Sequence, residues 1–563
     1  MNSNLFRAAI YSATMCLRSA SVHARQDPGG RGGFAKTAGE KAPCDKRNRH
    51  RLIAWALAAI FALAGSAATA ESPLTGENAK ELARLLAVPA ENKAVDFHFR
   101  KPPRIPASTL DRYLMWNEIA LDTTAIDHTP VDPASGEDPR RFGEQLGPPR
   151  SARAMAIIHI AMFDAENAIT KKFVSYSGIP AVQGNVNVSQ DRAIAQAAHD
   201  ALVALYPFQK DRIDAIFDED IVRIPGTQAA IDAGAALGTQ AANAIIALRQ
   251  KDGSAMPEPR WFSATPPGDY YPIGYPNVQP GIWQVDPISN LGVALGGNWP
   301  KVKPFVMTSA DQFRAPPPPM PPFLKNKAFK QTFNEEIRIG GDPTQGTNTS
   351  RTDHQTFIAK FWAYDGTPAL CAPPRLYNMI ARTIALQQKM RTVPEIARLF
   401  ALVNVATADA GLASWETKYF YQYWRPVTAI RLHSDPNFYP LGGQATNTAG
   451  PNFTPPFPSY TSGHATFGGA LFQILRKFFP DETPFTFVSD EWNGQNKDVN
   501  GNIRPLRPAS FKSFTQAEWE NAQSRLYMGI HWQFDAKNGI EQGNQVADFV
   551  FQHAFRPVRE ESP

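Results

Sequence analysis

The sequence predicts a mainly α protein, built as two helical bundles with long proline-rich irregular connections. Three observations support this fold class. Apolar residues recur at helical spacing over long stretches, alternating runs typical of strands are scarce, and 49 prolines occur in a chain with 43% hydrophobic and 19% charged residues. The composition is that of a globular protein, and 563 residues exceed what one ordinary core accommodates.

Helical patterns form an N-terminal and a C-terminal set. The first set comprises residues 109–126, 151–169, 190–206, 210–222 and 227–250. Its Ala-rich last member suits close helix packing. The second set comprises residues 324–340, 352–363, 374–390, 394–424, 463–479, 515–528 and 536–555. In these ranges the apolar residues recur at the period expected of amphipathic or buried helices.

A connector rich in Pro, Gly and aromatic residues separates the two sets. It runs over residues 257–322 and ends in a polyproline segment at 316–322. Because its aromatic content is too high for a free linker, we expect it to be ordered and to wrap around the helices. We therefore predict a leader at 1–70, a helical region with the connector at 71–323, and a C-terminal helical catalytic region at 324–563, which carries the motifs described below.

The leader has the pattern of a secretory signal peptide. Basic residues at 46–51 precede an apolar run from Leu52 to Ala64, and the small residues at 68–70 follow. The run of 13 residues is shorter than the ~20 that a membrane-spanning helix needs, which favours cleavage before Glu71 over a retained anchor. We expect an exported protein, periplasmic or secreted, without membrane attachment after cleavage.

Charge and cysteine content exclude several classes of protein. Residues 1–70 hold ten of the 57 Lys/Arg and three of the 52 Asp/Glu, so residues 71–563 carry 47 basic and 49 acidic side chains. This balance gives no electrostatic argument for binding nucleic acid or a membrane surface. Three cysteines, of which only Cys371 follows the leader, exclude a disulfide scaffold and a cysteine-based zinc array.

The first segment with candidate chemistry is WETKYFYQYWRP at 415–426. Lys418 and Arg425 are seven residues apart, which is two helical turns, and Trp415 lies one turn before Lys418. The spacing predicts that both cations and the indole share one helix face. A solvated basic stripe among core aromatic residues is the alternative explanation.

The second segment is PPFPSYTSGHAT at 455–466, which leads into an apolar helix. Ser462 is placed as an N-cap, so Gly463 and His464 occupy the first turn. Free backbone amides and the helix dipole attract an anion there. A simple helix cap with an incidental histidine explains the same residues.

The third segment is SRLYMGIHWQFD at 524–535. His531 and Asp535 are four residues apart, so the carboxylate is able to hold one ring nitrogen and leave the other free as a ligand or nucleophile. Arg525 lies six residues before His531, about 120° away around a helix. Their convergence therefore needs the reach of the arginine or a helix break near Gly529. A buried, satisfied histidine is the alternative for His531.

Together the three segments supply cations, a hydroxyl, a backbone N–H and two imidazoles, which suit a tetrahedral oxyanion such as phosphate or vanadate. Lys-x6-Arg-Pro, Ser-Gly-His and Ser-Arg-x3-Gly-x-His-x3-Asp resemble, in this order, the signatures of vanadium-dependent haloperoxidases and the type 2 phosphatidic-acid phosphatase superfamily. Four further stretches resemble the chloroperoxidase branch: 361–366, 409–411, 445–448 and 455–457. The resemblance is specific from about residue 355 to 540.

The resemblance implies a role for each site residue. Vanadate oxygens would be bound by Lys418, Arg425, Ser462, the N–H of Gly463 and Arg525. His531 would be the axial ligand of vanadium, and His464 would deprotonate hydrogen peroxide. Asp365 would hold Arg525, whereas Trp415 and Phe457 would form the halide side of the pocket. A surface carboxylate is the alternative for Asp365, and ordinary core packing is the alternative for the two aromatic residues.

The implied enzyme is a vanadate-dependent haloperoxidase, which oxidises chloride or bromide with hydrogen peroxide to a hypohalous acid that halogenates small organic acceptors. An acid phosphatase with His531 as nucleophile and His464 as general acid uses the same residues, so the three signatures do not separate the two enzymes. Trp415 and Phe457 beside the anion favour the haloperoxidase. A phosphate-binding helical protein without activity is a third possibility. The preferred halide, the organic substrate and the oligomeric state stay open.

Overall fold

The computed structural model describes residues 76–85, 106–130, 140–261, 280–320, 323–443, 452–496 and 502–558. The predicted leader and the stretch 445–448 lie outside these ranges. Residues Ala70–Pro563 form one compact unit. Within the described ranges, regular structure consists of fourteen α-helices, short 3₁₀ turns and one two-stranded sheet, which confirms the predicted mainly α fold.

The structure places a helix in every range that the sequence predicts as helical. The α-helices are α3 Gly76–Leu85, α4 Thr109–Asp127, α5 Pro148–Thr170, α6 Gln190–Leu205, α7 Lys210–Ile221, α8 Gln228–Arg249, α9 Lys327–Ile339, α10 Asp353–Phe361, α11 Pro373–Gln387, α12 Val393–Tyr421, α13 Pro426–His433, α14 Gly463–Arg476, α15 Phe514–Tyr527 and α16 Gln533–His553. The 3₁₀ helices are η2 Pro207–Gln209, η3 Trp299–Lys301, η4 Phe323–Lys325, η5 Pro343–Gln345 and η6 Asp490–Trp492.

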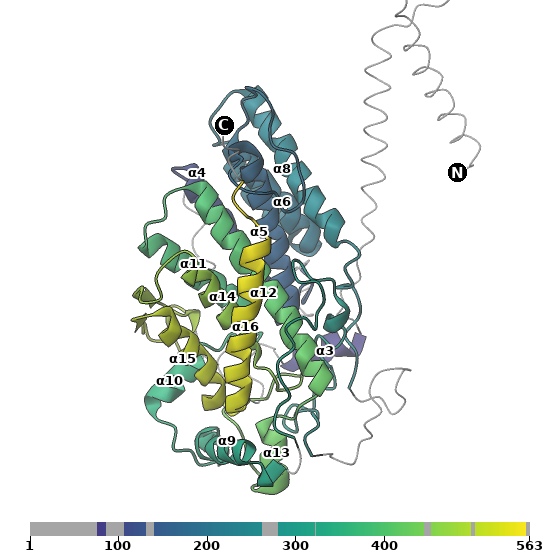
Figure 1. Cartoon of the computed structure of the whole chain (residues 1–563), viewed down its shortest axis with the longest axis vertical. Helices are drawn as coiled ribbons and strands as arrows, with labels where there is room; N and C mark the ends of the chain where they lie inside the picture. Colours follow the sequence, from purple (N-terminus) through teal and green to yellow (C-terminus); the bar gives the residue numbers. More distant parts are fainter. Residues whose placement is uncertain are drawn as a thin grey trace, which may run out of the picture. The chain divides into compact units, whose positions relative to one another are not determined.

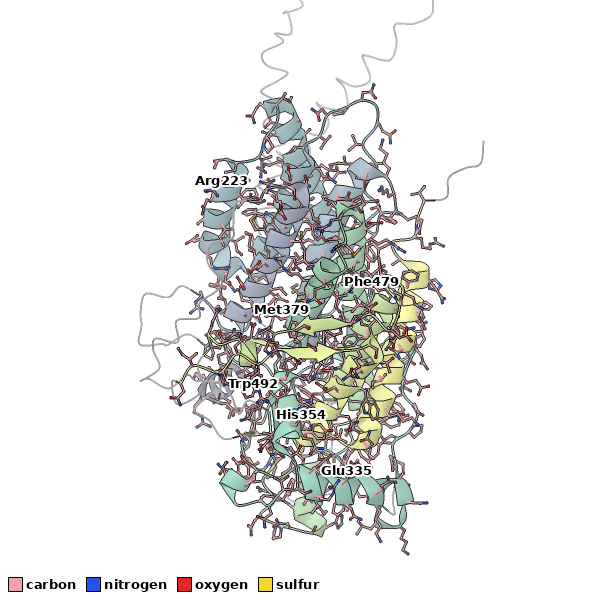
Figure 2. The ribbon with its side chains drawn as sticks, turned by 90° about the vertical axis from the view of Figure 1, so that its left-hand side faces the viewer. Arg223, Glu335, His354, Met379, Phe479 and Trp492 are labelled. Atoms are coloured by element: carbon pink, nitrogen blue, oxygen red, sulfur yellow. The ribbon has the colours of Figure 1, made fainter. Side chains whose placement is uncertain are left out.

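Besides the short 3₁₀ helices, four elements are absent from the sequence prediction: α3, α13 and the antiparallel strands β1 Phe485–Phe487 and β2 Ala509–Phe511. The strands lie beside Met379 of α11 (Figure 2). Three residues are too few for an alternating pattern to stand out. The predicted helix 394–424 ends early, at Tyr421, because Gln422 adopts a left-handed conformation with φ 50°. Pro426 then occupies the first turn of α13.

Helix α12 is the centre of the fold and runs beside α16 (Figure 1). It packs against α5 from the N-terminal region and against α14 and α16 from the C-terminal region. By length and composition α12 would be able to cross a membrane, as would α8, but 94% of the apolar window of α12 is buried inside the protein. One hydrophobic core extends from Tyr113 to Phe555, so the predicted regions 71–323 and 324–563 share a core.

The Ala-rich helix α8 packs closely on α6, as its composition predicts. A Cβ added at Gly234 would lie 2.5 Å from the carbonyl oxygen of Ser189, and one at Gly238 would lie 2.5 Å from that of Ala193. Only glycine allows the two backbones to approach this closely.

The connector is ordered along residues 280–320, as expected, whereas residues 262–279 lie outside the described ranges. The carboxylate of Asp409 on α12 accepts hydrogen bonds from the amides of Phe305, Val306 and Met307 at 2.7–2.9 Å. The amide of Leu295 donates to the carbonyl of Pro456 at 2.9 Å. These contacts attach the connector to α12 and to the loop that precedes α14.

Candidate active site

The end of α12 and the turn after it position the first two cations. Lys418 lies in the last turn of α12, with its Nζ 5.5 Å from the ring centre of Trp415. Arg425 is the residue before α13, and its Nη1 donates to the carbonyl of Ile530 at 2.8 Å. The prediction that one continuous helix carries both cations is therefore wrong. The turn at Gln422 brings Arg425 to the site instead.

The Lys418 ammonium is buried among backbone carbonyls. Its Nζ donates to the carbonyls of Pro458 and Ser459 at 2.9 Å and to that of Thr461. Burial and the charge of Arg425 lower the pKa of Lys418 well below its usual value. Three carbonyl acceptors favour the ammonium form, because only that form donates three hydrogen bonds. The alternative of a solvated basic stripe is excluded, because Lys418 and Arg425 are both buried.

Helix α14 begins as the sequence predicts. Ser462 is its N-cap, and the Ser462 hydroxyl accepts from the amide of Ala465 at 3.5 Å. Gly463 and His464 form the first turn. The amides of a first turn have no acceptor within their own helix, so they are available to an anion.

A helix break brings the third cation and the second histidine together. Arg525 lies in the last turn of α15, and Gly529 adopts φ 72° in the turn that follows. A Cβ at Gly529 would lie 2.5 Å from the carbonyl oxygen of Gly340, so only glycine fits this turn. His531 and Asp535 do not share one helix, because α16 begins at Gln533. Asp535 instead caps this helix by accepting from the amide of Trp532 at 3.1 Å.

His531 is held with one ring nitrogen turned to the cations. Its Nδ1 lies 2.8 Å from the Asp535 carboxylate, and its Nε2 lies 3.1 Å from Nη1 of Arg425. A proton on Nδ1 satisfies the carboxylate and leaves the lone pair on Nε2. Burial and the charge of Arg425 lower the pKa of His531 well below its usual value, so the ring is neutral.

His464 carries its ring proton on Nε2, whereas His531 carries it on Nδ1. Its Nε2 lies 2.6 Å from the carbonyl of Ala363 and 3.0 Å from that of Trp362. The ring has to donate in these contacts, so Nε2 carries the proton and Nδ1 keeps the lone pair. Burial lowers the pKa of His464 well below its usual value, and the charge of Arg525 acts in the same direction. The neutral imidazole is therefore a base.

Two carboxylates hold Arg525 and His531 in place. Both oxygens of Asp365 accept from Nη2 of Arg525, at 2.7 and 2.8 Å, and the Asp365 side chain is 4% exposed, which excludes a surface acid. Burial raises the pKa of Asp365, although Arg525 opposes the shift. Burial also raises the pKa of Asp535 to about 6, although a hydrogen bond from Ser459 opposes that shift.

A cavity of about 700 Å³, counted with its open mouth, lies in front of these groups. The cavity is lined by Leu82, His128, Leu146, Gly147, Pro148, Leu295, Asp365, Gly366, Pro373, Trp415, Phe453, Pro455, Pro456, Phe457, Gly463, His464, Phe467, Arg525, Ile530 and His531. The polar groups are few, and most of the wall is aliphatic, aromatic or proline. Trp415 and Phe457 pack together with ring centres 4.8 Å apart. Both side chains are almost entirely buried, yet each also lines the cavity. The two explanations given for them, core packing and a place in the pocket wall, therefore both apply.

Seven of the predicted site residues line the cavity: Asp365, Gly463, His464, Arg525, His531, Trp415 and Phe457. Lys418, Arg425, Ser462 and Asp535 hold the groups around it. Sequence reasoning missed Leu82, His128, Leu146, Leu295 and Phe453. These residues carry no motif, and distant parts of the chain bring them to the cavity, so the sequence offered no signal for them.

The site fits a tetrahedral oxyanion. Lys418, Arg425 and Arg525 are all buried, and two carboxylates, Asp365 and Asp535, oppose their three charges. Among the described residues, Nε of Arg525 is buried without a hydrogen-bond partner. Such an unpaired donor costs free energy unless an acceptor binds to it. A net positive site with an unpaired donor, helix amides and a neutral imidazole nitrogen matches vanadate or phosphate.

Comparisons with known proteins agree with this chemistry. Residues 398–560 match the family model of the second helical-bundle domain of VCPO. The vanadium chloroperoxidase of Curvularia inaequalis is 30% identical over 497 residues, which cover 75% of this chain and 78% of the relative. A bacterial vanadium-dependent iodoperoxidase structure aligns with a TM-score of 0.61 and 24% identity, over 79% of this chain and 98% of that chain. A holo-type bacterial vanadium-dependent chloroperoxidase aligns with a TM-score of 0.53 and 19% identity, over 77% and 96%.

Proposed function

The chain belongs to the vanadium haloperoxidase family, and we propose that it oxidises chloride or bromide to a hypohalous acid. It is an enzyme whose cofactor is vanadate and whose substrates are hydrogen peroxide and a halide. The assignment of the site rests on His531. Its Nε2 lone pair lies beside Arg425, within a buried cluster of positively charged side chains.

The residues that hold vanadate would be Lys418, Arg425, Ser462, the amide of Gly463, Arg525 and His531. The arginines and the amide would bind its oxygens, and Nε2 of His531 would coordinate the metal. Asp365 holds Arg525 through two hydrogen bonds, so the guanidinium is oriented before the anion arrives. Bound vanadate supplies a Lewis acid that activates hydrogen peroxide without a change in the oxidation state of the metal.

His464 handles the proton of hydrogen peroxide. Its Nε2–H is engaged by the carbonyls of Trp362 and Ala363, so Nδ1 is the atom that accepts the proton. The lowered pKa keeps Nδ1 unprotonated at mildly acidic pH. Lys418 would act on peroxide through its charge, because the carbonyls of Pro458, Ser459 and Thr461 accept its three N–H donors. Trp415 and Phe457 form the apolar wall from which a halide approaches, because a weakly hydrated anion tolerates such a surface beside the cations.

Vanadate binding tests the assignment of the metal ligand. Wild-type protein and the His531→Ala variant are incubated with vanadate, freed of unbound ion by gel filtration and analysed for vanadium. We expect stoichiometric vanadium in the wild type and loss of retention in the variant, with unchanged circular dichroism. The oxyanion contacts alone hold the ion only electrostatically. Unchanged affinity in the variant contradicts the assignment.

We also propose that the protein is exported, with cleavage before Glu71, from the basic, apolar and small-residue pattern of the leader. Mass spectrometry of the secreted or periplasmic protein is expected to give a mature N-terminus near this residue. A full-length cytoplasmic chain is the result that contradicts the proposal.

A further inference from the structure

The two oxygens of the Asp535 carboxylate have very different surroundings. Oδ2 accepts three hydrogen bonds, from Nδ1–H of His531 at 2.8 Å, from the amide of Trp532 at 3.1 Å and from the hydroxyl of Ser459. Oδ1 is buried, and among the described residues it has no hydrogen-bond partner. The oxygens of a free carboxylate are equivalent, so these three donors determine which oxygen faces His531 and where it lies.

Ser459 contributes to this group from a different part of the fold, the loop that precedes α14. Its side chain is fully buried. Its amide donates to the carbonyl of Tyr423 at 2.9 Å, and its carbonyl accepts from Nζ of Lys418 at 2.9 Å. These backbone hydrogen bonds attach the loop to the end of α12 without help from the hydroxyl, which is left to Asp535.

Ser459, His531 and Asp535 do not form a nucleophilic triad, although the residue types match one. In such a triad the histidine takes the serine proton, which needs a lone pair on the ring nitrogen that faces the hydroxyl. Here that nitrogen is Nδ1 of His531, 3.3 Å from the Ser459 hydroxyl, and its proton is donated to Asp535. The serine proton goes to the carboxylate. The hydroxyl therefore positions the other two groups and is not a nucleophile.

This positioning matters because His531 has to present the lone pair of Nε2 in one direction. The hydrogen bond from Nδ1–H fixes the ring only as firmly as Oδ2 itself is fixed. Asp535 belongs to the first turn of α16, so the Ser459 hydroxyl ties its carboxylate to a second element of the fold. Removing a partner that orients a metal-bound histidine typically lowers metal affinity about 10–100-fold.

We propose that Ser459 is a positioning residue for the vanadium ligand: its hydroxyl holds Asp535, and Asp535 holds the His531 ring with Nε2 toward the oxyanion. The proposal rests on the proposed function and deepens it, because Ser459 lies outside the three signature motifs. Ser459 acts on the bond from Nε2 to the metal. Its loss therefore weakens the binding of vanadate more than the binding of an oxyanion that the cations alone hold.

The affinities of vanadate and inorganic phosphate, both measured by isothermal calorimetry, test the proposal. Both ions are tetrahedral oxyanions that suit the buried cations, but phosphorus in inorganic phosphate accepts no bond from a ring nitrogen. Ser459→Ala is expected to weaken vanadate binding about tenfold or more and to leave phosphate binding nearly unchanged. The stoichiometry of each titration reports the folded fraction, so partial unfolding of a variant is separated from a loss of affinity.

Ser414→Ala is the matched control. Ser414 is as fully buried as Ser459, and its hydroxyl lies 3.3 Å from that of Thr461 in the same loop instead of at the carboxylate. Both affinities are expected to stay at their wild-type values in this variant.

A double-mutant cycle shows whether Ser459 acts through Asp535. In the Asp535→Asn background, Ser459→Ala is expected to weaken vanadate binding by a smaller factor than in the wild type, because the charged acceptor of the hydroxyl is gone. Equal factors in the two backgrounds mean that the two residues act independently, which overturns the proposal.

Two further results overturn the role of Ser459: an unchanged vanadate affinity in Ser459→Ala, and equal losses of vanadate and phosphate affinity, which indicate a general disturbance of the site. A wild-type protein that binds vanadate no more tightly than phosphate contradicts the assignment of His531 as the vanadium ligand, and with it the proposed function. The failure of the positioning role and the failure of the proposed function are therefore distinguishable.

Discussion

The two buried histidines of the site carry their protons on different nitrogens, which suits them to different tasks. The carboxylate of Asp535 accepts a hydrogen bond from Nδ1–H of His531, and backbone carbonyls accept one from Nε2–H of His464. The sequence predicts both histidines and the pairing of His531 with Asp535. It does not predict the carbonyls of Trp362 and Ala363, because any residue type supplies a carbonyl and only the fold decides which ones arrive.

Removing the base tests the role of His464. His464→Ala is expected to lower halide oxidation on the order of 100-fold, the usual scale of general acid–base catalysis, while vanadate still binds. Because the pKa of His464 is lowered, the wild-type enzyme is expected to keep its activity below pH 6.5, where an ordinary histidine is protonated. Steady-state rates across pH 4–8 measure both effects. A wild-type activity that falls with an apparent pKa of about 6.5 contradicts this assignment.

The orientation of His531 is tested through its carboxylate partner. Asp535→Asn replaces the charged acceptor of the Nδ1–H of His531 with a neutral amide that also presents an NH₂ donor, so the Nδ1 proton is no longer fixed. Vanadate affinity is expected to fall about 10–100-fold, as for other partners of metal-bound histidines. Vanadate titration by isothermal calorimetry gives the affinity. An unchanged dissociation constant would show that Asp535 serves only to cap α16.

Helix ends, rather than helix faces, assemble the site. Sequence periodicity locates the helices well, but it extends α12 past Gln422 to residue 424. The left-handed residues Gln422 and Gly529 end their helices. The sequence flags Gly529 as a possible break, whereas Gln422 gives no such signal, since glutamine rarely adopts this conformation. Arg425 and His531 meet because both follow such a break.

The turn at Gly529 is therefore expected to be sensitive to substitution. Gly529→Ala combines a positive φ with a Cβ 2.5 Å from the carbonyl oxygen of Gly340. We expect the unfolding free energy to fall by about 1–3 kcal/mol and vanadate affinity to fall with it, since His531 lies two residues on. Gly346→Ala is the control, because its φ is 82° and no atom lies within 4 Å of the added Cβ. Equal losses in both variants would mean that only backbone strain matters.

At the scale of the whole molecule, the two predicted sets of helices share one core around α12. Amphipathic patterns identify which faces are buried, but not which helix covers them. The N-terminal region also reaches the active site, since Leu82, His128 and Leu146 line the cavity. The motifs that carry the family resemblance lie between about residues 355 and 540, so sequence reasoning assigns no part of the cavity to these residues.

Buried carboxyls make stability depend on pH. Burial raises the pKa of Glu166 on α5 from 4.5 to about 7. The native state therefore holds a proton that the unfolded state releases, and stability falls as pH rises from about 4.5 through 7. Glu166→Gln lacks this titration. Relative to the wild type, the variant is expected to gain about 2–3 kcal/mol between pH 4.5 and pH 8, measured by urea unfolding. A pH-independent difference contradicts the buried-charge account.

The most direct test of the central claim compares two activities on one preparation. The protein is loaded with vanadate and assayed for bromide- and chloride-dependent halogenation of a dye with hydrogen peroxide. The same protein without vanadate is assayed for hydrolysis of an aryl phosphate. We expect halogenation that requires halide, peroxide and vanadate together. Efficient phosphate ester hydrolysis by the vanadate-free protein, with no halide-dependent turnover of the loaded form, would contradict the haloperoxidase and support a phosphatase.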